Sequence, residues 1–272
     1  MNESSAPGAP RFAIGHVPID GVSRSEALDR IAALVERRQG GAVFTPNVDH
    51  VVLAHEDPAF REAYGSVDLS VVDGMPVLWA CRALGLPVRE KISGSDIVSP
   101  LASLAAHRGW RVFLLGGRTG AAERAAARLV ENAPGLLIVG MSGAHVDMSR
   151  PMTEREALID EIRRASPDVV LVALGSPKGE LIAHEFRATL KPAVFVCVGA
   201  ALDFLAGLVP RAPGWVSSAG LEWLYRLARE PRRLWARYLL RGPRFLPIVA
   251  KALLVRAGAH LMGPRGPSDP PR

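Results

Sequence analysis

The sequence lacks the features that mark several large classes of protein. It has 2 cysteines, Cys81 and Cys197, which stand far apart in apolar runs, so neither a disulfide framework nor a zinc site is expected. The first ten residues have no signal-peptide pattern. No stretch of about 18 uncharged apolar residues occurs, because the nearest candidate, residues 245–262, is interrupted by Lys251 and Arg256. We therefore expect a cytoplasmic protein without a membrane span.

Several common catalytic motifs are also missing. The chain has no P-loop, no Gly-x-Ser-x-Gly elbow, no His-Glu-x-x-His and no Asp-x-Asp pair, so the hydrolases and metal-dependent transferases that use them are not supported. The run Gly116-Gly117-Arg118-Thr119-Gly120 is similar to a dinucleotide-binding turn. It lacks the full Gly-x-Gly-x-x-Gly, and no acidic residue ends the next apolar run. An NAD-linked enzyme is thus a weak alternative.

The positive charge is confined to the C-terminal part. Residues 211–272 carry 12 Lys and Arg against 3 Asp and Glu, whereas residues 1–210 carry 21 against 24. A nucleic-acid coat would spread its basic residues over a domain face. The separation instead predicts a mildly acidic body with a basic attachment that meets an anionic partner.

Apolar, β-branched runs alternate with helical patterns along the body. Such alternation is typical of an α/β fold with a mainly parallel sheet and helices on both faces. The expected strands are residues 42–44, 67–72, 111–115, 136–139, 169–174 and 193–198. A first helix is expected after the capping box at residues 23–26. Further helices are expected at residues 49–64, 75–84, 95–107, 119–131 and 178–190, and one more is expected to begin at residue 153. After residue 210 only helices are expected.

Polar or glycine-rich turns end five of the expected strands. In open α/β sheets the ligand lies beyond the carboxyl ends of the strands, and glycine turns let backbone N–H groups approach a phosphate. Five such ends on one edge predict a ligand crevice there. The turns are residues 45–47, 73–74, 116–117, 175–178 and 199.

Asp73 is the best single candidate for a catalytic residue. It follows the apolar pair Val71-Val72, so its carboxyl group would be partly desolvated at the sheet edge and suited to act as a general base. A helix N-cap for the segment from Met75 is an equally good interpretation. The histidines at positions 50, 55, 145 and 184 have no Cys/His cluster nearby, and surface or helix-face positions are expected for them.

The basic segment contains an arginine stripe. Arg226, Arg229, Arg233 and Arg237 are spaced by three or four residues and would share one helical face, although Pro231 interrupts the helix. Arginines repel one another unless an anion is close, so phosphate recognition is favoured. Nucleic acid, lipid phosphate and a nucleotide diphosphate all stay open on this ground.

Taken together, the motifs resemble the WecG/TagA/CpsF family of glycosyltransferases, glycosyltransferase family 26. The resemblance covers roughly residues 14–246 in the same order, and its last block is highly specific. The matching blocks are residues 45–50, 72–79, 93–96, 175–178, 199–204, 211–213 and 220–231.

The resemblance implies a fold and an activity. It implies a Rossmann-like core with a C-terminal appendage. The loss of strand patterns and the change in charge near residues 209–213 place the core at 13–210 and the helical appendage at 211–262, and disordered ends are expected at 1–12 and 263–272. The resemblance also implies an inverting transferase that needs no metal ion or other cofactor. Such enzymes move an N-acetylmannosamine-type sugar from UDP to a polyprenyl-diphosphate-linked sugar, in teichoic-acid, common-antigen or exopolysaccharide synthesis. The expected place is the inner face of the cytoplasmic membrane, as a peripheral protein.

Roles for individual residues follow from the matched motifs. Asp73 becomes the general base, and Thr45 and Asn47 line the acceptor and sugar pocket. Asp203 helps to hold the nucleotide. The arginines of the appendage that meet the diphosphate are Arg226, Arg233 and Arg237. The other expected substrate-binding residues are Lys91, Gly94, Asp96, Gly116, Gly175, Ser176, Lys178 and Glu180.

Two positions depart from the family pattern. Gly179 stands where the family usually has Gln, and Lys91 stands where it often has Arg, which loses the fork geometry of a guanidinium. Besides N-acetylmannosamine, a glucose- or glucuronate-type donor therefore stays open. A non-catalytic regulator that binds nucleotides or nucleic acid is the alternative function, although no nucleic-acid partner is expected for the enzyme. The oligomeric state, including a homo-oligomer, is left open.

Overall fold

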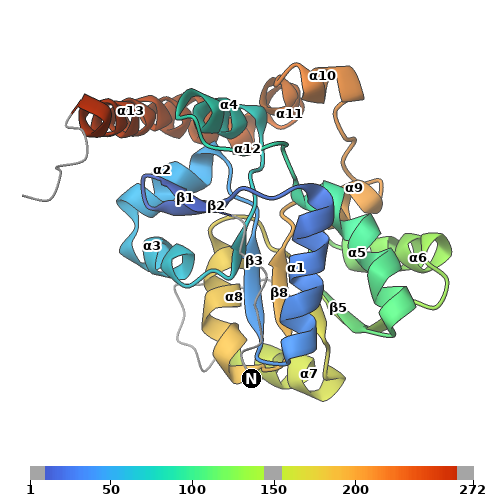
Figure 1. Cartoon of the computed structure of the whole chain (residues 1–272). Helices are drawn as coiled ribbons and strands as arrows, with labels where there is room; N and C mark the ends of the chain where they lie inside the picture. Colours follow the sequence, from blue (N-terminus) through green and yellow to red (C-terminus); the bar gives the residue numbers. More distant parts are fainter. Residues whose placement is uncertain (1–9, 144–154, 262–272) are drawn as a thin grey trace, which may run out of the picture.

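A six-stranded parallel sheet forms the centre of the protein, for which the computed structural model describes residues 10–143 and 155–261 (Figure 1). Its strand order is β4-β3-β8-β7-β5-β6. The strands are β3 (Gly41–Phe44), β4 (Leu69–Ser70), β5 (Arg111–Gly116), β6 (Leu137–Ser142), β7 (Val169–Ala173) and β8 (Val194–Cys197). All six were expected from the apolar runs, although β4 is much shorter than its run.

Helices cover both faces of this sheet. On one face α1 (Arg24–Arg37), α5 (Gly94–Arg108) and α6 (Ala121–Asn132) bury their apolar side chains. On the other lie α2 (Val48–Glu56), α3 (Pro58–Gly65), α7 (Glu156–Ala165) and α8 (Lys178–Thr189). Strands buried on both faces are near-continuously apolar, which is why the sequence predicted them. The Rossmann-like α/β prediction is confirmed.

One expected helix, residues 49–64, is two helices. The break falls at Asp57, whose carboxylate accepts hydrogen bonds from the N–H groups of Ala59 and Phe60 as the N-cap of α3. Pro58 has no N–H to donate to the preceding turn, so it begins a helix more readily than it continues one. The helix expected from residue 153 is α7, which begins at Glu156; residues 153 and 154 lie outside the described part.

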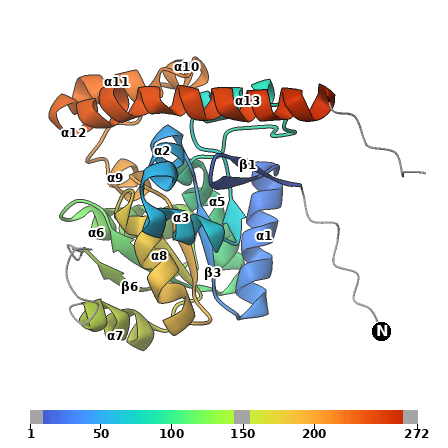
Figure 2. The same cartoon turned by 90° about the vertical axis from the view of Figure 1, so that its left-hand side faces the viewer.

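The appendage forms a layer across the carboxyl edge of the sheet (Figures 1 and 2). It consists of α10 (Gly214–Ser218), α11 (Glu222–Arg229), α12 (Pro231–Trp235), a π-helical turn (Ala236–Arg241), a 3-10 turn (Gly242–Arg244) and α13 (Phe245–Leu261), and it follows the short α9 (Ala201–Leu205). The helix α4 (Met75–Ala83) lies in the same layer. Phe245 is buried in the core cluster of the α2 face, so the appendage is packed onto the body.

A hairpin that the sequence analysis did not predict precedes the core. It consists of β1 (Arg11–Ile14) and β2 (Val17–Asp20), which pair antiparallel. Its first strand includes residues 11 and 12, which were expected to be disordered. Residues 1–9 and the expected tail at 263–272 lie outside the described part. Four-residue strands joined by a two-residue turn carry too short a pattern to recognise.

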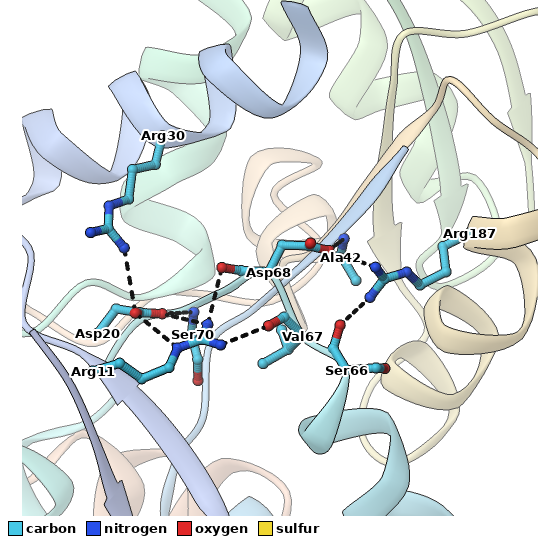
Figure 3. A network of polar contacts seen from close by, with 9 residues as sticks. All are labelled: Arg11, Asp20, Arg30, Ala42, Ser66, Val67, Asp68, Ser70 and Arg187. Carbon is cyan, nitrogen blue, oxygen red and sulfur yellow. Dashed lines mark hydrogen bonds and ion pairs between the residues drawn. The ribbon is translucent and has the colours of Figure 1, made fainter. Parts of the chain in front are cut away.

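Polar contacts fasten the hairpin to the edge of the sheet (Figure 3). Asp20 is 3% exposed, and its carboxylate lies 2.9 Å from Arg11 Nη2 and 3.4 Å from Arg30 Nη1. It also accepts a hydrogen bond of 2.8 Å from the N–H of Ser70 in β4. A buried carboxylate is stable when its oxygens are paired in this way. Asp20 therefore joins the hairpin, α1 and the short edge strand.

We expect Asp20→Ala to lower the free energy of unfolding by about 3 kcal/mol. The substitution leaves the N–H of Ser70 without its partner and separates two guanidinium groups from their counter-charge. Urea unfolding followed by circular dichroism measures the loss. The control is Asp29→Ala on the exposed face of α1, which should change stability by under about 0.5 kcal/mol. Equal effects of the two changes would remove Asp20 from this role.

Candidate active site

A cavity of about 500 Å³ lies at the carboxyl edge of the sheet, between the strand-end turns and the appendage. This is where open α/β sheets bind ligands. The predicted residues that line it are Thr45, Asn47, Asp73, Gly94, Gly175, Ser176, Lys178, Glu180, Asp203, Arg226, Arg233 and Arg237. The structure thus brings together residues that are up to 192 positions apart between Thr45 and Arg237.

Three of the predicted residues lie off this wall. Lys91 lines an adjoining cavity of about 370 Å³ that also reaches Asp73, and its Nζ is 3.6 Å from Asp96 Oδ2. Asp96 is held by the hydroxyl of Ser93 and by Arg211. These contacts hold Asp96 in the first turn of α5. Gly116 is packed against the backbone of Ala173, and its neighbour Gly117 faces the cavity in its place.

Gly94 shows why a glycine is needed in this wall. A Cβ at this position would lie 2.4 Å from the carbonyl oxygen of Val198, far inside any real contact. The first residue of α5 therefore touches the end of β8 directly, because it has no side chain. This close approach brings the start of a helix, with its free N–H groups, to the cavity.

Asp73 has an environment suited to proton transfer. Its backbone N–H donates to the carbonyl of Pro46 over 2.8 Å, which ties the two strand-end turns together. Burial raises the pKa of the Asp73 carboxyl to about 6, against the opposing attraction of Lys91. The N-cap of α4 is Gly74, without a side-chain hydrogen bond. Asp73 is therefore not a helix cap, and the carboxylate is left for a ligand.

Thr45 and Asn47 lie beside Asp73 on the next turn. The buried Thr45 hydroxyl donates to the carbonyl of Cys197 over 3.2 Å, and its oxygen can still accept from a ligand. The side-chain amide oxygen of Asn47, Oδ1, caps α2 by accepting a hydrogen bond of 3.0 Å from the backbone N–H of Asp49. It also lies 3.3 Å from Arg237 Nη2, so this cap connects the body to the appendage.

Most of the arginines at the cavity are already paired with carboxylates. Asp49 lies 3.1 Å from Arg237 Nε and 3.0 Å from Arg241 Nη1. Glu230 pairs with both Arg118 and Arg233. These ion pairs offset the repulsion between the arginines, for which the sequence alone showed no compensating charge. The pairs of Asp49 and Arg118 also hold the appendage against the body.

Two cations at the cavity have no carboxylate partner among the residues that the structure describes. They are Lys178, at the start of α8, and Arg226, on α11. The Arg226 guanidinium lies 5.8 Å from the ring centre of Phe204, and its buried Nε has no hydrogen-bond partner. A positive charge held in this way is ready for an anion such as a phosphate.

The predicted arginine stripe is not one continuous helical face. The helix α11 ends at Arg229 and α12 begins at Pro231, as the position of the proline suggested. Arg229 stacks on Tyr225 at 5.3 Å and is absent from the cavity wall, whereas Arg226, Arg233 and Arg237 line it. Three of the four arginines thus converge on one cavity from separate helical segments.

Asp203 is hydrogen-bonded to the glycine turn that follows β5. Its Oδ1 accepts from the backbone N–H of Arg118 over 2.8 Å, and its Oδ2 is 3.7 Å from Arg118 Nε. It thereby fixes the turn that carries Gly117, which has φ +88° and lines the cavity. The role that the resemblance implies, holding the nucleotide, is not tested by these contacts.

His50 lies on the helix α2, one of the two positions expected for it, but it is not at the surface. It is 4% exposed and lines the cavity, with Nδ1 2.7 Å from the hydroxyl of Tyr64. Burial lowers the pKa of His50 to about 3, so the ring is neutral. Its place in the first turn of a helix that follows a strand-end turn was a usable signal. Of the other histidines, His55 is exposed and His184 half-buried, as expected, and His145 lies outside the described residues.

Within the described ranges, no group of three or more His, Cys, Asp and Glu side chains is arranged to hold a metal ion. Of the carboxylates that line the cavity, Asp49 and Asp203 lie beside arginines. None of the described helices has the length and apolarity needed to cross a membrane.

Comparison with known proteins agrees with this arrangement. A sequence model of the glycosyl transferase WecG/TagA/CpsF family matches residues 12–259. The chain is 30% identical over 229 residues to the N-acetylglucosaminyldiphosphoundecaprenol N-acetyl-beta-D-mannosaminyltransferase of Bacillus spizizenii, covering 84% of this chain and 86% of that protein. The protein of the same name from Bacillus subtilis is 29% identical over 205 residues, covering 75% and 77%.

The match runs through the body and the appendage, so it includes every residue of the cavity wall. An enzyme is therefore established, in place of the non-catalytic regulator considered as an alternative. The family model covers nearly the whole length of the chain, and the sheet and its cavity agree with it. This chain therefore belongs to the WecG/TagA/CpsF family of glycosyltransferases.

Proposed function

We propose that this glycosyltransferase moves a hexose from a UDP-sugar to a sugar carried on a polyprenyl diphosphate, with inversion and without a metal ion. One observation carries the proposal. A single cavity combines Asp73, a carboxyl group with a raised pKa, with two cations that lack carboxylate partners among the described residues, Lys178 and Arg226. The names of the two Bacillus relatives support this class of acceptor.

The proposed reaction is a direct displacement. The Asp73 carboxylate takes the proton of the acceptor hydroxyl, and the oxygen attacks the anomeric carbon from the face opposite UDP. A new glycosidic C–O bond forms while the bond between that carbon and the β-phosphate oxygen breaks, and UDP leaves with the electron pair. Lys178 and Arg226 balance the charge that grows on the leaving diphosphate. Thr45 and Asn47 hold the sugar and the acceptor in line.

Transfer by the purified full-length chain tests this function. UDP-N-acetylmannosamine, UDP-glucose and UDP-glucuronate are offered separately with a short-chain polyprenyl-diphosphate N-acetylglucosamine, with and without EDTA. We expect one donor to be used at equal rates in both buffers, and NMR of the product to show an inverted anomeric centre. No transfer from any donor would refute the function, loss of activity in EDTA would refute metal independence, and a retained configuration would refute the displacement.

We further propose that the layer formed by α4 and the appendage rests on the inner surface of the cytoplasmic membrane. Among the described residues, the large apolar side chains that are exposed lie almost entirely in this layer, the exceptions being Val130, Leu137 and Met141. Those in the layer include Trp79, Trp215, Leu224, Trp235, Leu239, Leu240, Leu246, Leu254 and Val255. Arginines between them suit anionic headgroups.

We expect the double change Trp215→Ser and Leu254→Ser to weaken binding to vesicles of anionic phospholipid by about tenfold or more. These side chains are 72% and 74% exposed, so most of their apolar surface faces solvent and would be covered in a bilayer. Vesicle sedimentation measures the effect. Leu137→Ser, on the edge strand β6, is the matched control and should bind as the unmodified protein does. Undiminished binding of the double variant would exclude this face.

A further inference from the structure

A second cavity, of about 720 Å³, lies between the β1–β2 hairpin, α2 and α13. Figures 1 and 2 both show α13 lying across the hairpin and α2. The cavity has the size of a typical small-molecule site. Among the described residues, none that lines it also lines either of the cavities that contain Asp73. The proposed transfer reaction therefore does not account for it.

The interior of this cavity is apolar. Val52 of α2 is buried there, as are Leu84 and Leu86 at and after the end of α4. Ile248 and Ala252 of α13 also line it, and both pack against the core cluster of the α2 face. Water finds few hydrogen-bond partners in such a space, and an empty space forgoes dispersion contacts. An apolar occupant is therefore favoured.

The mouth of the cavity is positively charged. Three exposed cations line it from α13 and the turn before it, namely Arg244, Lys251 and Arg256. Arg244 Nη1 is 2.6 Å from the carboxylate of Glu56, whereas Lys251 and Arg256 have no carboxylate partner among the described residues. Burial lowers the pKa of His16 in the hairpin turn, and Lys251 is among the positive charges that lower it further. Two fixed cations are thus left for an anion.

Two turns of the body touch α13 beside this cavity. A Cβ at Gly15 in the hairpin turn would lie 3.0 Å from Ile248 Cγ2. A Cβ at Gly85, in the turn after α4, would lie 3.8 Å from Arg256 Nη2. Both glycines have a positive φ, of +60° and +63°, which side chains rarely adopt. The elements that enclose the cavity are therefore packed against one another.

An apolar interior with a cationic mouth fits an amphiphilic anion. A free nucleotide or inorganic phosphate has no apolar part to fill the interior, and a neutral hydrocarbon would leave the cations without a partner. Val255 lines the cavity and also belongs to the exposed apolar side chains of the layer proposed to rest on the membrane. A phospholipid of that membrane can therefore reach the cavity with both its phosphate and an acyl chain.

We propose that the cavity between the hairpin and α13 binds one anionic phospholipid of the cytoplasmic membrane. The phosphate meets Lys251 and Arg256, and one acyl chain lies in the apolar interior. This inference goes beyond the transfer reaction, because the lipid is bound and not consumed. It adds a specific attachment to the general contact that the exposed apolar side chains make with a bilayer.

Native mass spectrometry of the full-length chain in detergent with phosphatidylglycerol tests the interior. We expect a single bound lipid per chain, and Ala252→Phe should lower the lipid-bound fraction by about tenfold or more, because the new ring fills the interior. Leu253→Phe, on the same helix but outside the cavity lining, is the matched control and should keep the lipid. Circular dichroism checks that both variants are folded. A lipid kept by Ala252→Phe, or lost equally from both, would overturn the site.

The double change Lys251→Glu and Arg256→Glu tests the mouth. Both side chains are exposed, so the fold should be kept while binding of phosphatidylglycerol falls by about tenfold or more. Arg229→Glu with Arg232→Glu makes the same change in net charge at exposed positions outside the cavity and should keep the bound lipid. The unmodified chain should bind zwitterionic phosphatidylcholine more weakly than phosphatidylglycerol. Equal losses from the two double variants, or equal binding of the two lipids, would contradict an anion site here.

Competition identifies the source of the ligand. We expect neither palmitate nor inorganic phosphate, at the same concentration as phosphatidylglycerol, to displace the bound lipid. Displacement by palmitate would assign the cavity to a free fatty acid, and displacement by phosphate would assign the mouth to a soluble anion; either result refutes the phospholipid. These measurements need no donor or acceptor sugar, so their outcome is independent of the proposed transfer reaction.

Discussion

Asp73→Asn should lower kcat/KM by about a thousandfold while the protein keeps its fold. The amide has nearly the same shape as the carboxylate but cannot take the acceptor's proton. No helix depends on the carboxylate, since α4 has Gly74 as its N-cap. Transfer is measured with the donor and the polyprenyl-diphosphate acceptor, and the fold by circular dichroism. Asp29→Asn, at an exposed position on α1, should be fully active.

The pH profile gives this prediction a second readout. A general base works in its ionised form, so transfer by the unmodified enzyme should fall as the pH drops through about 6, the value to which burial raises the pKa of Asp73. The residual activity of Asp73→Asn should lack this fall. Near-normal turnover of the variant, or the same fall in both proteins, would assign the proton transfer to another group.

Arg226→Ala should lower kcat/KM by about a hundredfold to a thousandfold through loss of charge stabilisation at the leaving diphosphate. The choice of this arginine follows from its contacts. Arg237 and Arg241 are paired with Asp49, and Arg233 with Glu230, so removing any of them would take one partner from a carboxylate. Arg226 has no carboxylate partner among the described residues, so its loss should appear in donor binding and turnover more than in stability.

A shift of the pH profile should accompany the loss. Arg226 is one of the charges that lower the pKa of Asp73, opposing the effect of burial. In Arg226→Ala the fall in activity should therefore occur at a higher pH than in the unmodified enzyme. Arg229→Ala, on the same helix but stacked on Tyr225 outside the cavity, is the matched control and should leave donor affinity unchanged. Equal losses from the two changes would contradict the role of Arg226.

The strands and their polar ends could be predicted because their signals are local. Runs such as Val169–Ala173 are buried on both faces of a parallel sheet, and that environment produces an apolar pattern in the sequence itself. The turns that follow them share one edge because parallel strands end on the same side. Asp73 and Lys178 could therefore be assigned to a crevice from the order of strands and turns alone.

One local feature, the break between two helices at Asp57, went unrecognised although its signal was present. Asp57 and Pro58 form a typical helix start, an N-cap followed by a proline at the first helical position. The hairpin of Arg11–Ile14 and Val17–Asp20 has strands too short for periodicity to identify. It exists because Asp20 connects it to Arg11, Arg30 and the edge strand, and these contacts arise between distant parts of the chain.

The amino-acid sequence thus established the α/β order, the edge on which the site lies and the family. The pairing of the charges depended on the folded chain. The sequence shows a row of arginines from 226 to 237, and their spacing alone does not tell which of them is free. Folding joins Arg237 to Asp49 and Arg233 to Glu230, and it leaves Arg226 beside the ring of Phe204 at the cavity. Ion pairs and burial depend on distances of a few ångströms between remote segments, and packing sets those distances.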